Sequence, residues 1–176
     1  MSREEDSHAR PEGDVAATAS PAAARAWVLL DWAASGFSTV LITLVVTYVE
    51  KVVFAGPGSL AGGVVWAWTI AAAMLASALV APWAAAWADR GGRHRAALLA
   101  GVAAGCGGLG LLAAAPPTAH AAVIAAIVVA CVGFDMAAIF TGALLPRIAS
   151  GTAADRLSAA GFAAGYAGGA IALVLA

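Results

Sequence analysis

Apolar stretches long enough to cross a membrane recur along this chain, separated by short polar breaks. A helix of about 20 residues spans a hydrocarbon layer of roughly 30 Å. Because 62% of the residues are hydrophobic and only 11% are charged, a water-soluble core could not bury this much apolar surface. The sequence therefore predicts an all-α integral membrane protein.

Helix breakers and charged turns divide the chain into five expected spans. Pro116 and Pro117 follow the third span, and Pro146 ends the fourth. Residues 1–25 mix acidic residues with Ala, Ser and Pro and lack bulky side chains, which predicts a disordered cytoplasmic tail. The expected membrane spans cover residues 27–49, 63–88, 96–115, 121–145 and 157–176.

The positions of the basic residues predict the orientation of the spans. If the tail is cytoplasmic, only Lys51 among the 9 lysines and arginines falls on the outer side. We therefore expect a multi-pass protein of the cell membrane with a cytoplasmic amino terminus. Tryptophans prefer the headgroup level, and those near the expected span ends are Trp27, Trp32, Trp83 and Trp87 inside and Trp66 and Trp68 outside.

The turn from Ala88 to Arg95 cannot lie in lipid and fixes where the chain leaves the membrane. Asp89 lies at the carboxyl end of its span, where a negative charge opposes the helix dipole and needs a cationic or amino-terminal partner. His94 is expected to add to the basic charge of the turn. A hydrophilic turn that serves only topology is the alternative to a functional one. The candidate functional residues of the turn are Asp89, Arg90, Gly92, Arg93 and Arg95.

Two carboxylates within the spans are candidates for transport and coupling. Asp135 lies well inside the fourth span, where an ionised side chain costs about 2.5 to 3.5 kcal/mol, so it should face protein or water. It either exchanges a proton or cation during transport or serves only as a hydrogen-bond acceptor for neighbouring helices. Asp31 is the second candidate and lies about one and a half turns inside the first span, close to the inner interface.

Small and hydroxyl side chains indicate how the helices meet. Hydroxyl side chains form a stripe at four-residue steps along the first span. They either line a cavity or donate hydrogen bonds to carbonyl groups of their own helix, and the second alternative is favoured for each residue. Glycines in the third and fifth spans allow close approach, and packing within one protomer is favoured over a dimer surface. Cys106 and Cys131 lie at different expected depths, so no disulfide is expected. The stripe consists of Ser35, Thr39, Thr43 and Thr47.

Four segments resemble, in the same order, parts of the major facilitator superfamily, in particular its branch of vacuolar effluxers related to autophagy. They are residues 26–33, 88–93, 143–146 and 157–169, and residues 85–95 resemble the superfamily's loop signature between helices two and three. The resemblance implies twelve helices in two six-helix halves with the substrate between them. The charged turn would then help to hold one face of the transporter closed. The chain departs from the pattern at Ala34 and Gly142, where the family has Asn, and at Arg147, where it has Asp.

The resemblance implies secondary active transport of a small polar solute, with protons as a candidate coupling ion. Residues 26–176 would form the incomplete first half of the permease. Because the last span reaches Ala176 within an apolar run, we expect a fragment that needs its carboxyl-terminal half to transport. The alternative is a five-helix membrane scaffold that transports nothing.

Other classes of function lack their sequence signals. The basic residues form no continuous stripe, so no nucleic-acid partner is expected. No phosphate-binding loop, nucleophile elbow or zinc-helix motif is present, which predicts neither an enzyme nor a cofactor. The histidines have no metal-ligand partner at useful spacing, so no metal site is expected. The expected partners are therefore membrane lipid, the solute and the second half of the permease.

Overall fold

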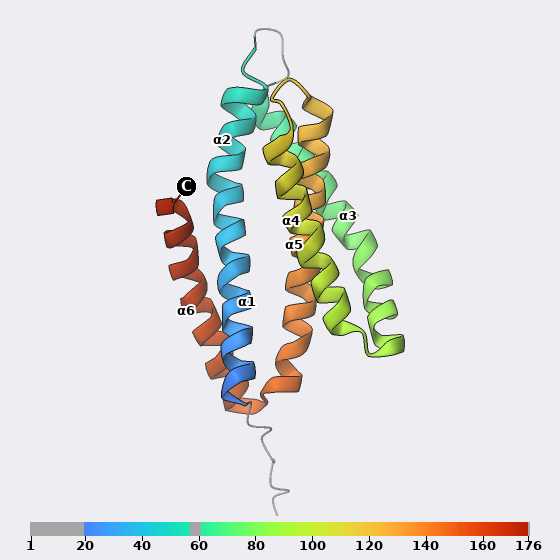
Figure 1. The fold of residues 1–176 in the computed structure, drawn as a ribbon, viewed down its shortest axis with the longest axis vertical. Helices are drawn as coiled ribbons and strands as arrows, with labels where there is room; N and C mark the ends of the chain where they lie inside the picture. The colour runs from blue at the N-terminus through green and yellow to red at the C-terminus, as the bar shows by residue number, and fades with distance from the viewer. Residues whose placement is uncertain (1–19, 57–60, 176) are drawn as a thin grey trace, which may run out of the picture.

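The computed structural model describes residues 20–56 and 61–175, and these residues form a bundle of long helices in which consecutive helices run in opposite directions (Figure 1). Within these ranges, five helical segments are long and apolar enough to cross a membrane. They confirm an all-α, multi-pass membrane protein. The segments are Pro21–Val53, Gly62–Gly91, His94–Ala114, His120–Ile148 and Gly151–Leu175.

The first segment is continuous but not uniform. It consists of α1 (Pro21–Val40), the π-helical turn η1 (Leu41–Val45), α2 (Val46–Tyr48) and a second π-helical turn, η2 (Val49–Val53). In η1 the amide of Val46 reaches back five residues to the carbonyl of Leu41, which widens the helix.

The first helix begins earlier than expected, at Pro21 instead of Trp27. Ser20 caps it, because its hydroxyl oxygen accepts a hydrogen bond of 3.2 Å from the amide of Ala23. Proline suits the first helical position, where no amide hydrogen is needed. The end of the expected tail, up to Arg25, is therefore helical, and residues 1–19 lie outside the described ranges.

The threonines of the hydroxyl stripe in the first span bond back to their own helix. Thr39, Thr43 and Thr47 each donate to the carbonyl oxygen four residues earlier, at 2.9, 2.6 and 2.7 Å. This confirms the favoured interpretation of these threonines. Such back-bonding slightly destabilises a helix. The row of back-bonded threonines runs through η1, where the helix is widened.

The remaining helices are α3 (Gly62–Gly91), α4 (His94–Ala114), α5 (His120–Ile148) and α6 (Gly151–Leu175). The central helix is α5, which packs against α4, α3 and the first segment, while α6 packs along α1 (Figure 1). Cys106 and Cys131 are both free, as expected.

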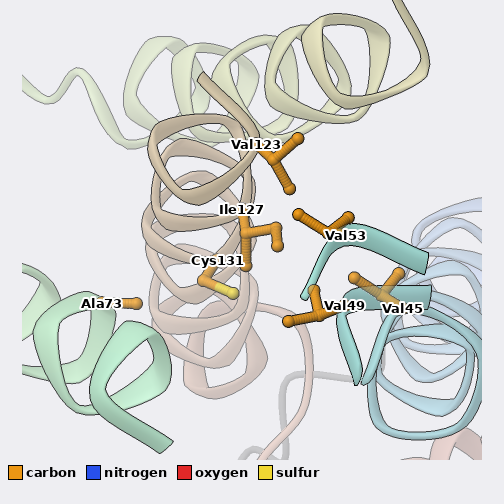
Figure 2. Close-up of a cluster of buried hydrophobic side chains, with 7 residues drawn as sticks. All are labelled: Val45, Val49, Val53, Ala73, Val123, Ile127 and Cys131. Carbon is orange, nitrogen blue, oxygen red and sulfur yellow. The ribbon is translucent and has the colours of Figure 1, made fainter. Parts of the chain in front are cut away.

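A buried cluster joins α5 to the first segment and to α3 near one end of the bundle (Figure 2). Side chains from α5 point toward the valines of η1 and η2, and Ala73 of α3 approaches from the other side. The small side chain of Ala73 lets α3 come near α5, while the branched valines of the first segment pack against α5 from the other side. The members of the cluster are Val45, Val49, Val53, Ala73, Val123, Ile127 and Cys131.

Helices α5 and α6 also extend beyond the expected spans. Helix α5 runs through Pro146 to Ile148, because a proline in the last turn sacrifices few helical hydrogen bonds. Helix α6 begins at Gly151 instead of Leu157, because the carbonyl of Ser150 accepts amide hydrogen bonds from the first turn. Asp155 therefore lies on a helix and not in a loop.

Glycines create two close helix contacts, and both lie within one protomer. On α4, Gly101, Gly105 and Gly108 face α5. On α6, Gly161 faces Trp27 and Asp31, while the glycines that follow it face Ser35, Trp32 and Thr39 of α1. Small residues let the helix backbones approach closely in lipid, where hydrophobic burial gives no drive for association.

Gly101→Ala is expected to destabilise the bundle. A Cβ atom there would lie 2.8 Å from the amide nitrogen of Ala137 and 2.9 Å from the carbonyl oxygen of Gly133. Such overpacking costs about 1 to 3 kcal/mol, measurable by thermal unfolding in detergent. The matched control is Gly107→Ala on the same helix, because nothing lies within 4 Å of its Cβ position. Equal stability of the two variants would contradict the close α4 to α5 contact.

Candidate functional site

A carboxylate and a hydroxyl group meet halfway along two neighbouring helices. The hydroxyl of Ser77 on α3 donates a hydrogen bond of 2.6 Å to Oδ2 of Asp135 on α5. At 1.5 Å per residue, Asp135 lies about 22 Å from the start of α5 and about 20 Å from its end. Ser77 lies at a similar distance from both ends of α3. The pair is therefore as far from both helix ends as the bundle allows.

The two partners differ in exposure. Ser77 is buried, with 8% of its surface exposed, whereas Asp135 is exposed apart from its contact with α3. The serine fixes one carboxylate oxygen, and the exposed part of Asp135 is available to water, an ion or a further chain. In a membrane the carboxylate needs such a partner, because lipid tails offer it no hydrogen bond.

The sequence singled out Asp135 but not Ser77. A signal was present, because Ser77 is the only polar residue of α3 between Thr69 and Asp89. Depth along each helix follows from the sequence, but the rotation that turns Ser77 toward α5 depends on helix packing.

Asp31, the second carboxylate candidate, lies apart from Asp135. A Cβ atom added at Gly161 would lie 3.0 Å from Oδ2 of Asp31, so the carboxylate lies in the close contact between α1 and α6. It lines a cavity of about 630 Å³ between α1, α4, α5 and α6, and Asp135 does not line this cavity. Because α1 starts at Pro21, Asp31 also lies deeper in its helix than expected.

Trp27 beside Asp31 is a packing residue and not an interfacial anchor. Only 6% of its surface is exposed, and its indole Nε1–H donates a hydrogen bond of 3.0 Å to the carbonyl oxygen of Thr141 on α5. A buried indole needs such an acceptor. Trp27 therefore connects α1 to α5 at the end of the bundle where α1 begins.

The charged turn between α3 and α4 is built on Gly92. Its φ of 61° is in the left-handed region that glycine adopts without steric cost. The turn is closed by a hydrogen bond of 2.8 Å from the amide of Arg93 to the carbonyl of Ala88. This geometry explains why Gly92, and not Gly91, is the glycine that the turn requires.

The structure gives Asp89 a partner that the sequence did not propose. Oδ1 of Asp89 lies 2.9 Å from Nε2 of His94 at the start of α4. His94 is buried and packs edge-on against Phe140 of α5, with ring centroids 6.3 Å apart. His94 therefore packs inside the bundle, beside Asp89 and Phe140, and is not exposed like the arginines of the turn.

Nε2 of His94 has two competing neighbours. Arg147 on α5 places Nη2 3.4 Å from it, and Oδ1 of Asp89 lies 2.9 Å from the same nitrogen. A protonated Nε2 donates to Asp89, and only a bare Nε2 accepts from Arg147. This one nitrogen can therefore link α4 either to α3, through Asp89, or to α5, through Arg147. Asp89, His94 and Arg147 therefore form a polar contact where three helix ends meet.

The arginines of the turn point elsewhere. Arg90, Arg93 and Arg95 are exposed, and none forms an ion pair with another described residue. The guanidinium carbon of Arg93 lies 5.3 Å from the ring centroid of Trp87, a cation–π contact. The candidate turn therefore pairs an exposed Asp89 with the buried His94 and carries three exposed arginines.

Comparisons with known proteins add nothing to the resemblance to the major facilitator superfamily, which rests on the sequence motifs alone. No family model, curated protein or solved structure matches the chain. Among the described residues, no group of three or more His, Cys, Asp or Glu side chains could hold a metal ion. The carboxylate and hydroxyl pair at the middle of the bundle is therefore the principal candidate site.

Proposed function

We propose that this chain takes part in secondary active transport of a small polar solute, as the amino-terminal part of a permease of the major facilitator type. The observation that carries the proposal is the exposed carboxylate of Asp135 at the middle of α5, held on one side by Ser77. Ionisable groups within membrane helices are rare and mark substrate or ion pathways and proton relays.

The position of the pair supports a role in coupling. Ser77 lies on α3 and Asp135 on α5, so a change in the charge of the carboxylate alters a contact between two spans. In secondary transporters, substrate and coupling-ion sites lie near the bilayer midplane, at the interface between repeats. A second bundle facing Asp135 would enclose the carboxylate in such an interface. Protons are the coupling ion that we propose, because a carboxylate can take up and release them.

The charged turn fits a conformational role in the same permease. Asp89 and His94 join the end of α3 to the start of α4, and Arg147 competes for the same histidine nitrogen from α5. A contact with two arrangements is the kind of element that alternating access requires. We propose that the turn stabilises one of the two states, in line with the loop signature that residues 85–95 resemble.

Asp135→Asn in the full-length permease is expected to reduce solute-dependent proton uptake to background. The amide retains the shape of the side chain and still accepts a hydrogen bond from Ser77, but it cannot exchange a proton. Proteoliposomes containing a pH-sensitive dye measure the uptake, with a mixture of amino acids and then a mixture of sugars as probes. Unchanged proton uptake in this variant would make Asp135 a structural hydrogen-bond acceptor only.

Asp155→Asn is the matched control, because Asp155 is an exposed acid at the start of α6, far along the chain from the pair. It should insert and transport like the parent. If the parent itself shows no solute-dependent flux with either mixture, the five-helix scaffold becomes the better interpretation of the chain.

We further propose that the amino terminus and the end of the bundle that carries the α3–α4 turn are cytoplasmic, in the cell membrane. That end carries most of the basic residues, whereas Lys51 lies at the other end. With Cys106 and Cys131 replaced by Ala, an impermeant maleimide added to intact cells should label Thr118→Cys and not Ser150→Cys. The opposite labelling would reverse the orientation.

A further inference from the structure

Helices α3 and α4 meet at the charged turn and then diverge, so that they leave a groove floored by α5 (Figure 1). The groove has a volume of about 400 Å³, and its lining is almost wholly apolar. Small side chains of α4, among them Ala97, Ala100 and Ala104, form one wall, and Ala84 and Trp87 of α3 form the other. The volume is within the range of pockets that hold small ligands.

The mouth of the groove carries positive charge. Trp87 lines the groove at the turn, and Arg93 holds its guanidinium over the Trp87 ring at 5.3 Å. Arg90 and Arg95 flank this position and are exposed. Asp89 lies 2.9 Å from His94 and has 70% of its side chain exposed, so the turn carries three exposed arginines and one exposed carboxylate. The groove therefore combines an apolar channel along the helices with a cationic cluster at the level where lipid headgroups lie.

We propose that this groove binds an anionic phospholipid, with one acyl chain between α3 and α4 and the phosphate at Arg93. Charge complementarity selects the occupant, because basic pockets between membrane helices bind acidic headgroups. The aromatic ring of Trp87 suits the boundary between acyl chain and headgroup. A bound lipid at this position contacts the turn that joins α3 to α4, so it stabilises their separation. The proposal does not depend on transport.

Native mass spectrometry of the full chain in detergent tests the site, with phosphatidylglycerol as the probe and phosphatidylcholine as its uncharged comparison. We expect the parent to retain phosphatidylglycerol in preference to phosphatidylcholine. Arg93→Gln should weaken phosphatidylglycerol binding by about fivefold, the effect of one basic residue at a membrane surface. Arg156→Gln is the matched control, because this exposed arginine lies on α6, which contributes no residue to the groove, and it should bind like the parent.

A second variant tests the contribution of the apolar groove separately from that of the positive charge. Ala100→Leu fills the groove without changing the charge, and Ala100 is exposed, so the substitution does not disturb the core. It should also weaken phosphatidylglycerol binding. Equal binding of the two lipids would overturn the proposal, as would equal losses in the Arg93→Gln and Arg156→Gln variants. Full binding by Ala100→Leu would likewise overturn it, because the lipid would then be held by surface charge alone.

Discussion

The hydrocarbon of a membrane offers no hydrogen-bond partner, and this constraint governs the whole bundle. Backbone groups are satisfied within long helices, and polar side chains must find acceptors inside the protein. The threonines of the first span do so through their own helix carbonyls. Trp27 donates to a carbonyl of α5, and Ser77 donates to Asp135. Only in the last pair is one partner an ionisable group that stays exposed, and this makes it the functional candidate.

Close packing by small residues places that pair. Helix α5 is held against α4 by glycines that leave no room for a side chain, while α3 contacts α5 through Ala73 and Ser77. Helices α3 and α4 have little contact with each other, and the space between them is the groove that we assign to a phospholipid. The same arrangement therefore positions a carboxylate at the middle of the bundle and a cationic cluster at its end.

The sequence predicts the helices and the depth of Asp135, because both depend only on the order of apolar and polar residues along the chain. It does not predict contacts such as those from Trp27 to Thr141 or from Ser77 to Asp135, which join residues 114 and 58 positions apart. These contacts depend on how each helix is rotated, and uniformly apolar helices give little periodic signal for rotation. Helices α5 and α6 extend beyond the expected spans for a local reason, since Pro146 and Ser150 act through hydrogen bonds in a single turn. The burial of His94 could not be predicted either, because it depends on packing against Phe140 of another helix.

The central claim is that Asp135 faces water or an enclosed polar interface and not lipid. A cationic methanethiosulfonate, which reacts with thiolates in water, tests it in native membranes with Cys106 and Cys131 replaced by Ala. The comparison is Leu79→Cys, an exposed residue close to Ser77 in depth. We expect Asp135→Cys to react at least about tenfold faster than Leu79→Cys, because an ionisable residue at this depth faces a hydrated pathway. Equal and slow reaction at both positions would contradict it.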